Sequence, residues 1–196
     1  MLCFKEKMKL IIGLTGYSCT GKDTFYESIY EAYPIPRITT GDLVRKEVQR
    51  RGLEITPANI SEISDLIRME TRNNFMKIAE KEISALSRKY EALIVDSLRE
   101  EQDYETLRQF SSNIETVAVV SASRIRYKRM AKRKRKGDPL SWEEFLALEQ
   151  KERLLGVENL IKSAGFIVSN EEDIYEFRRK SIEIMKKLLS KYQLSI

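Results

Sequence analysis

Apolar residues along this chain follow two periodicities. Five short runs rich in β-branched residues are typical of buried strands, and they lie at roughly 9–15, 35–39, 92–96, 115–121 and 165–169. Between these runs, apolar residues recur at helical spacing, as at Phe25 and Ile29 near the start and at Ile174, Phe177 and Met185 near the end. The pattern predicts strands separated by helices, which is the organisation of an α/β protein.

The longest predicted helical region follows the second strand. One predicted helix there carries Ile60, Ile63 and Ile67 on one face, and the apolar pattern continues beyond Asn73 and Asn74 towards Leu86. No repeat or low-complexity linker separates this region from the rest. With 196 residues, the chain is therefore predicted to form a single domain, 1–196.

Composition narrows the cellular locations in which the protein is expected. Cys3 and Cys19 are too few for a disulfide framework and lack metal-ligand spacing, which favours a reducing cytoplasmic location. No apolar stretch approaches the roughly 20 residues of a membrane span. The first seven residues are too short and polar for a secretory signal, and we interpret them as a loosely held extension or an upstream start.

The clearest chemical signal is the stretch from Gly13 to Thr24, between the first strand and the first helix. Its glycine spacing lets successive backbone N–H groups converge on phosphate oxygens, while the helix dipole and Lys22 add positive charge. The spacing predicts a P-loop that binds nucleotide phosphates through Gly16, Ser18, Cys19, Thr20, Gly21, Lys22, Asp23 and Thr24. The alternative is a glycine-rich turn that binds nothing.

One position in this loop departs from the usual pattern. A Ser or Thr that ligates Mg²⁺ ordinarily follows the lysine, but here Asp23 follows Lys22 and Thr24 comes one residue later. Thr24 is the predicted magnesium ligand of the loop. Asp23 has two open interpretations, a helix cap or a catalytic carboxylate beside the γ-phosphate position.

A second segment of interest follows the second predicted strand. Thr40, Gly41 and Asp42 precede a helix, and Arg45 projects from its first turn. Charge placed at the carboxyl end of a strand lies where α/β proteins bind ligands. The simpler alternative is a helix cap beside a solvated arginine.

The third predicted strand also ends in charge. Asp96 closes it, and Arg99 follows three residues later. A carboxylate here suits Mg²⁺ held through water, and an arginine suits bidentate contact with an anionic acceptor. The alternative is that Asp96 caps a helix starting near Glu100.

Positive charge is concentrated in one segment. Residues 124–136 contain nine Lys or Arg and no acid, which leaves 26 basic and 30 acidic residues elsewhere. On a helix, Arg126, Arg129 and Arg133 share one face, with Arg135 just beyond, before Gly137, Asp138 and Pro139 break the element. Arginine's planar fork suits a transferring phosphoryl group, so these four are candidate catalytic residues. The competing interpretation is a nucleic-acid contact through the same segment.

Taken together, these segments resemble those of the nucleoside-monophosphate-kinase-like P-loop superfamily. The Gly-Lys-x-Thr ending and the Thr-Gly-Asp-x-x-Arg segment are similar to those of adenylate kinases, whereas Ser97 replaces a glycine and the spacing to Arg99 is one residue shorter. Within the superfamily, the chain looks most like an archaeal adenylate-kinase-related group, often labelled dephospho-CoA-kinase-like, with a Trp-Glu-Glu-Phe stretch such as Trp142 to Phe145.

The resemblance implies a P-loop NTP-hydrolase-type fold, with a parallel five-stranded sheet flanked by helices. It also implies a small helical acceptor-binding insertion at about 41–90 and a short lid at about 124–139. ATP and Mg²⁺ would be co-substrate and metal, with Lys22 on the phosphates and Asn170 in a loop beside adenine. Thr24 and Asp96 would organise the metal, and Thr40, Gly41, Asp42, Arg45 and Arg99 would hold the acceptor.

The implied function is ATP-dependent transfer of the γ-phosphoryl group to a small-molecule acceptor, a nucleoside monophosphate in the first instance. One alternative is dephospho-CoA kinase, whose hydroxyl acceptor benefits from a carboxylate base such as Asp23 or Asp42. Another is a nucleotide-dependent RNA-binding or regulatory module that works through residues 124–136. Neither alternative involves a membrane partner.

Overall fold

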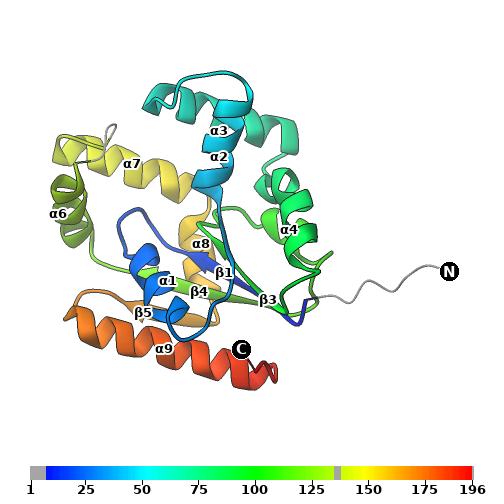
Figure 1. The fold of residues 1–196 in the computed structure, drawn as a ribbon. Coiled ribbons are helices and arrows are strands. Elements are labelled where there is room, and N and C mark those ends of the chain that lie inside the picture. Colours follow the sequence, from blue (N-terminus) through cyan, green and yellow to red (C-terminus); the bar gives the residue numbers. More distant parts are fainter. Residues whose placement is uncertain (1–7, 135–137, 196) are drawn as a thin grey trace.

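The computed structural model describes residues 8–134 and 138–195. Its centre is a five-stranded parallel sheet in the order β2-β3-β1-β4-β5 (Figure 1). The strands are β1 (Leu10–Thr15), β2 (Arg37–Thr39), β3 (Ala92–Asp96), β4 (Ile114–Val120) and β5 (Phe166–Ser169). The predicted α/β fold with five parallel strands is confirmed.

Helices connect the strands and cover both faces of the sheet. They are α1 (Lys22–Tyr30), α2 (Thr40–Arg50), α3 (Pro57–Thr71), the 3-10 helix η1 (Phe75–Ala79), α4 (Glu80–Leu86), α5 (Asp103–Leu107), α6 (Ser123–Arg133), α7 (Trp142–Leu154), α8 (Val157–Lys162) and α9 (Ile174–Lys191). No helix within the described ranges is long and apolar enough to cross a membrane.

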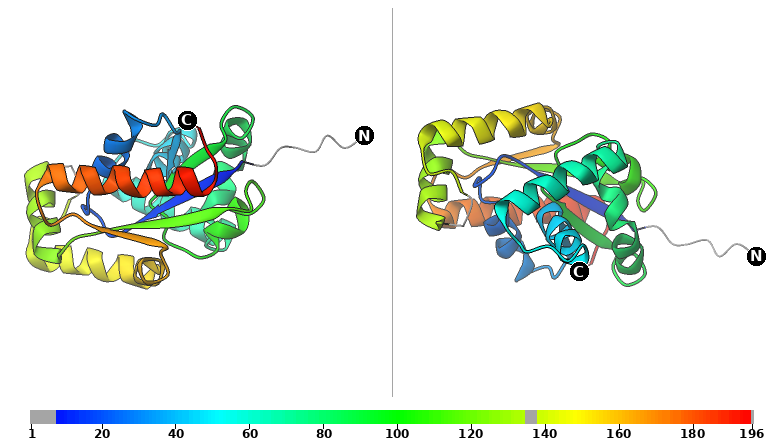
Figure 2. Two further views of the ribbon diagram at one scale, coloured as in Figure 1. Left: turned by 90° about the horizontal axis from the view of Figure 1, so that it is seen from below. Right: turned by 90° about the horizontal axis from the view of Figure 1, so that it is seen from above.

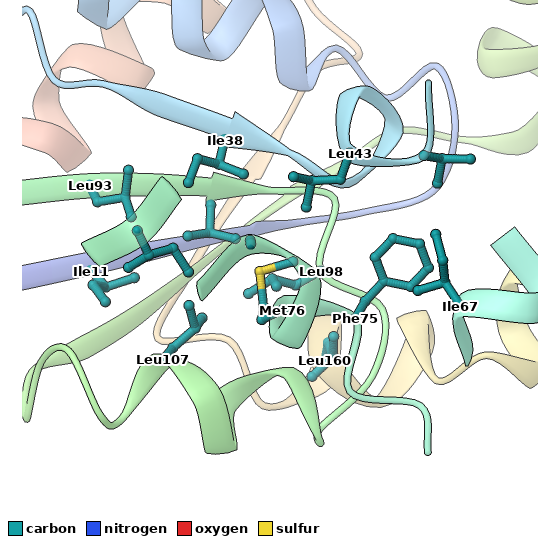
Figure 3. Packing of buried hydrophobic residues seen from close by; sticks show 14 of the residues in the cluster. Ile11, Ile38, Leu43, Ile67, Phe75, Met76, Leu93, Leu98, Leu107 and Leu160 are labelled. Atoms are coloured by element: carbon teal, nitrogen blue, oxygen red, sulfur yellow. The ribbon is translucent and has the colours of Figure 1, made fainter. Parts of the chain in front are cut away.

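The apolar side chains of the strands divide between two cores because successive residues of a strand point to opposite faces. Ile12 and Ile94 pack with residues of α1 and α9 on one face, and Figure 2 shows α9 lying across it. On the other face, Ile11 and Leu93 pack with residues of α2, α3, η1, α4, α5 and α8, as Figure 3 shows for part of this cluster. The strands are thus buried on both sides, as their continuous apolar runs predicted.

Two predicted elements differ from the structure. The helix expected near Glu100 begins at Asp103. The second amphipathic stretch after residue 57 is divided into η1 and α4. Left-handed backbone at Arg72 (φ 54°) and Asn73 (φ 63°) ends α3 and separates it from these helices.

The sheet topology brings the predicted site segments to one edge. Because all five strands are parallel, the predicted site segments lie at or just after the carboxyl ends of strands. These segments are the P-loop, Thr40, Asp96, the start of α6 and Asn170. β1 lies between β3 and β4, so the P-loop emerges where the order of strands reverses. Of the predicted site residues, Arg135 lies outside the described residues, as do residues 1–7 and Gly137.

Candidate active site

The loop from Gly16 to Gly21 joins β1 to α1 with backbone that requires glycine at both ends. Gly16 has φ 136° and Gly21 has φ 104°. A Cβ on Gly16 would lie 2.2 Å from the Val119 carbonyl oxygen, and one on Gly21 would lie 2.1 Å from Asn170 Nδ2. The two glycines of the predicted spacing are therefore required both by their positive φ angles and by the lack of room for a Cβ.

Lys22 folds back over the loop that precedes it. Its Nζ donates to the carbonyl oxygens of Gly16 (2.8 Å) and Tyr17 (3.1 Å). Burial lowers the pKa of Lys22, and the nearby Asp96 carboxylate opposes this shift. The loop also holds Cys19 in left-handed backbone (φ 63°), and burial raises the pKa of its thiol. The ammonium group of Lys22 is thus positioned within the loop that we expect to hold phosphate.

Arg37 on β2 links two carboxylates beside the P-loop. Its Nη1 lies 3.0 Å from Asp23 Oδ1 and 3.3 Å from Asp96 Oδ2. The side chain of Asp23 is 80% exposed, whereas that of Asp96 is 4% exposed. Burial raises the pKa of Asp96, while Lys22 and Arg37 act in the opposite direction.

The two helix-cap alternatives are wrong for these carboxylates. The N-cap of α1 is Gly21 and no side chain caps it, so Asp23 is an exposed ion-pair partner in the first turn. Asp96 accepts hydrogen bonds from Arg37 (3.3 Å) and from the Ser97 hydroxyl (3.0 Å), and α5 begins only at Asp103. Both carboxylates lie at the mouth of the P-loop instead.

The predicted magnesium ligands fit a metal that arrives with nucleotide. Within the described residues, no group of three or more His, Cys, Asp or Glu could hold a metal. Mg²⁺ in phosphoryl-transfer proteins commonly takes one or two carboxylates and completes its shell with phosphate oxygens and water. Asp96, buried beside the Lys22 cation, and Thr24, in the first turn of α1, are compatible with that mode.

The segment after β2 forms the first turn of α2. Thr39, rather than one of the predicted residues, is the N-cap and accepts from the Asp42 N–H (3.1 Å). The Thr40 hydroxyl donates to the Ser97 carbonyl (3.3 Å), which ties this turn to the end of β3. Arg45 donates to Asp42 (2.7 Å). Arg45 is therefore held by an acidic neighbour rather than solvated alone.

A buried glutamate joins the P-loop to the arginine that follows β3. Glu152 on α7 is 1% exposed, and its carboxylate accepts from the Ser18 N–H (2.9 Å) and hydroxyl (2.7 Å). The same carboxylate lies 3.0 Å from Arg99 Nη2. A carboxylate thus bonds both a P-loop amide and a predicted acceptor-binding cation.

Of the predicted lid arginines that the structure describes, Arg126 is the most deeply buried. It is 3% exposed and forms an ion pair with Glu149 on α7. Its guanidinium lies over the rings of Tyr17 (4.8 Å) and Phe145 (5.2 Å). Arg126 therefore fastens α6 to α7 and to the P-loop.

Arg129 and Arg133 occupy the same side of α6. Arg129 donates to the carbonyl oxygens of Thr20 (3.3 Å) and Asn170 (2.7 Å), so it reaches the P-loop directly. Arg133 pairs with Asp138 (2.6 Å). The buried Asn170 side chain donates to the same Thr20 carbonyl (2.8 Å), so it also supports the P-loop.

A cavity of about 350 Å³ opens beside these groups. Ser18 and Glu152 form its P-loop side. Its charged wall consists of Arg45, Arg68, Arg99, Glu100, Asp103, Arg133, Asp138 and Lys151. Apolar residues of α2, α3, η1, α6 and α7 complete the lining. The cavity therefore lies between the predicted phosphate loop and the predicted acceptor segments.

Sequence reasoning missed four charged residues that belong to this region: Arg37, Arg68, Glu149 and Glu152. The two glutamates stand three residues apart on a helix, a spacing that also fits a solvated face. No local signal marks Glu152 as buried or Glu149 as partly buried, because their burial depends on α7 packing against α6 and the P-loop. Arg37 lies within a short strand, where its direction follows from the pairing of β2 with β3.

Comparison with known proteins agrees with this architecture. A family model described as "AAA domain" matches residues 15–146. A UPF0200 protein of Thermococcus onnurineus (strain NA1) is 31% identical over 186 residues, covering 93% of this chain and all of that protein. That name states no activity.

Two solved structures share the fold. A gluconokinase from Sinorhizobium meliloti 1021 has a TM-score of 0.60 at 16% identity, covering 95% of this chain and 97% of that one. A dephospho-CoA kinase from Campylobacter jejuni has a TM-score of 0.54 at 15% identity, covering 92% and 98%.

Proposed function

This chain belongs to the AAA domain family and to the UPF0200 proteins, and from that premise we propose that it is an ATP-dependent phosphotransferase acting on a nucleoside monophosphate. The predicted superfamily, that of the nucleoside-monophosphate-kinase-like P-loop proteins, is confirmed by family and fold. At the coarser level, the fold is that of a P-loop small-molecule kinase. The acceptor and the roles of individual residues are our proposal.

The observation that carries the proposal is the cavity. It is bounded by Ser18 of the P-loop on one side and by Arg45 and Arg99 on the other. A phosphoryl group leaving the P-loop would pass into a space whose wall carries five cations and four carboxylates, and this excess of positive charge suits an anionic acceptor. Helices within 41–90 supply the acceptor side, and we assign residues 124–139 to the lid.

Phosphoryl transfer depends chiefly on positioning and electrostatic stabilisation. We assign Lys22 and the loop amides to the ATP phosphates, with Lys22 exchanging its carbonyl partners for phosphate oxygens. Arg129 and Arg133, which face the same region from α6, would stabilise charge on the group in transfer. Mg²⁺ bound with ATP would be held by Thr24 and, through water, by Asp96, and would neutralise phosphate charge.

A second candidate acceptor is a hydroxyl group, as in dephospho-CoA kinase. Asp23 or Asp42 would then be the base. Asp23 pairs with Arg37 and Asp42 pairs with Arg45, so each carboxylate is held in place by an arginine. A monophosphate acceptor needs no such base, because its attacking oxygen is already anionic.

The test is incubation of the protein with γ-radiolabelled ATP and Mg²⁺, together with a panel of nucleoside monophosphates, dephospho-CoA, gluconate, or no acceptor. We expect label in a nucleoside diphosphate. Label in dephospho-CoA or gluconate would select the hydroxyl class. Absence of any labelled acceptor, together with RNA binding that weakens steeply with salt, would overturn the kinase proposal.

Lys22→Ala provides the control for this experiment. Removing a cation from the transition state should reduce kcat/KM at least about 100-fold. Lys22 is the first residue of α1, and within the described part of the chain its side chain donates to the loop carbonyl oxygens of Gly16 and Tyr17, so the melting temperature should change little. Unchanged turnover in this variant would contradict the proposed site.

A further inference from the structure

Arg68 lines the cavity from α3 and has an unused donor. Its side chain is 15% exposed, and Nη1 donates to the Ser64 hydroxyl (2.7 Å) and carbonyl (3.3 Å). Among the described residues, Arg68 Nε is the one buried side-chain nitrogen or oxygen that has no hydrogen-bond partner. A buried donor without a partner destabilises the folded state, more so when it is charged, so its presence here calls for a function.

The carboxylates around Arg68 compensate its charge only in part. Asp65 Oδ1 lies 3.6 Å from Nη1, and Glu100 Oε1 lies 3.7 Å from Nε, both beyond hydrogen-bond distance. Burial lowers the pKa of Arg68, and the neighbouring Arg99 cation lowers it further. Two guanidinium groups therefore share one wall of the cavity.

Arg99 also has N–H donors beyond the one in its ion pair with Glu152. This ion pair uses one nitrogen, Nη2. A planar guanidinium has five N–H donors, and pairs of such groups match the oxygens of a phosphate. The apolar residues Val44, Ile60 and Leu155 line other parts of the same cavity and suit an uncharged ring.

We propose that Arg68 is an acceptor-binding residue that holds, together with Arg99, the phosphate of the acceptor. This inference rests on the proposed function and adds a contact that no sequence motif supplied. Arg68 selects for acceptors that carry an anionic group, because an uncharged acceptor would leave Nε unpaired beside a second cation. Lysine would replace Arg68 only in part, because lysine retains the charge but lacks the planar guanidinium with its Nε and Nη donors.

The experiment compares the binding of AMP and of adenosine by isothermal titration calorimetry in the absence of ATP. The variants are Arg68→Ala, Arg68→Lys and, as a matched control, Arg50→Ala, whose side chain is 71% exposed on α2 and pairs with Glu47. Loss of a charge-assisted contact should weaken AMP binding roughly 10- to 100-fold in Arg68→Ala. Arg68→Lys should be intermediate, Arg50→Ala unchanged, and adenosine binding should be equal in all four proteins.

Equal AMP affinity in the wild type and in a folded Arg68→Ala would overturn the proposal. If Arg68→Ala fails to fold, as judged by circular dichroism, the comparison uses Arg68→Lys, which keeps the volume and charge. An equal loss of adenosine and AMP binding would indicate that Arg68 only supports α3.

Failure of the proposed function is distinguishable from failure of this inference. Inorganic phosphate is titrated into a Lys22→Ala protein, in which the P-loop cation is absent, with and without Arg68→Ala. Phosphate binding that requires Arg68 supports the anion subsite even if no acceptor is ever phosphorylated. Phosphate binding that is unchanged by Arg68→Ala contradicts it, whatever the kinase activity.

Discussion

Asp23, Arg37 and Asp96 form a line of alternating charge beside the P-loop. Arg37 is 20% exposed and lies between an exposed carboxylate and a buried one. An exposed ion pair contributes about 0–1 kcal/mol, so the Asp23 pair has little structural value. The deviation in the P-loop motif therefore points to chemistry or electrostatics rather than to helix capping.

Asp23→Ser tests this at the residue scale. We expect the free energy of unfolding to change by less than about 1 kcal/mol, since the pair is exposed. With a nucleoside monophosphate, kcat should change less than about tenfold, because no general base is needed for that acceptor. Steady-state kinetics and urea denaturation measure both. A loss of about 100-fold or more at unchanged stability would identify Asp23 as a base and favour a hydroxyl acceptor.

A second prediction at the scale of residues concerns Asp103 and the pH dependence of stability. It is 1% exposed, accepts from the Met76 N–H (3.2 Å), and burial raises its pKa from 3.8 to about 6. A raised pKa favours the protonated folded state, so its contribution to stability is complete below about pH 4 and is lost as the pH rises through 6. The nearby Glu100 carboxylate acts in the same direction.

Asp103→Asn should remove this pH dependence while keeping an acceptor for Met76. Relative to wild type, the variant should gain about 3 kcal/mol of unfolding free energy between pH 4 and pH 7.5, from two pKa units at 1.36 kcal/mol each. Urea denaturation of both proteins at each pH gives this difference, in which other titrating groups cancel. A difference between the proteins that is constant with pH would contradict the raised pKa.

At the scale of elements, α6 has two faces with different tasks. Arg126, Arg129 and Arg133 point towards α7, the P-loop and Asp138, whereas Lys128 and Lys132 are exposed, as is Lys134, the C-cap residue that follows the helix. The basic run that the sequence left ambiguous is therefore divided by helical geometry into a partnered arginine face and a solvated lysine face. The lid interpretation uses the first face, and a nucleic-acid contact would use the second.

Replacing Lys128, Lys132 and Lys134 together by alanine separates these two uses. We expect kcat and KM for phosphoryl transfer to stay within about threefold of wild type, because solvated lysines contribute mainly screened, long-range charge. The corresponding Arg129→Ala should reduce kcat at least about 100-fold. A triple variant that loses salt-dependent RNA binding and also loses transfer would mean that the two faces act together.

At the scale of the whole molecule, α7 holds the site together. Glu152 connects Ser18, which is 134 residues earlier in the chain, with Arg99 after β3. Trp142 and Phe145 stack at 5.2 Å, and both contact Tyr127 of α6, so α6 rests on the same support. The position of α6 and the geometry of the P-loop are thus linked through one helix.

Glu152→Ala should destabilise the whole protein. It removes two hydrogen bonds from a buried carboxylate and leaves Arg99 without this partner, at a cost of about 3 kcal/mol. Glu152→Gln, which can still accept from Ser18, should lose less. Gln150→Ala, at an exposed position of the same helix, is the control. Urea denaturation measures all three, and a change below 1 kcal/mol in Glu152→Ala would show that these bonds contribute little.

The sequence by itself determined the features that depend on neighbours along the chain. The P-loop was predictable because its glycines answer local backbone requirements, and the five strands because buried parallel strands are continuously apolar. The sequence also predicted which segments would lie close together, because the carboxyl ends of parallel strands meet at one edge of the sheet.

Only the tertiary structure decided how the charges pair. Glu152 pairs with Ser18 of the P-loop and with Arg99 after β3, and Arg126 pairs with Glu149 of α7, so these partners lie far apart in the sequence. Helical spacing alone is the same for a buried glutamate and a solvated one. Burial determines the roles of these groups, because a charge removed from water requires partners or ligands. The packing of α3 and α7 against the P-loop edge therefore determined both the shape of the cavity and which arginines face it.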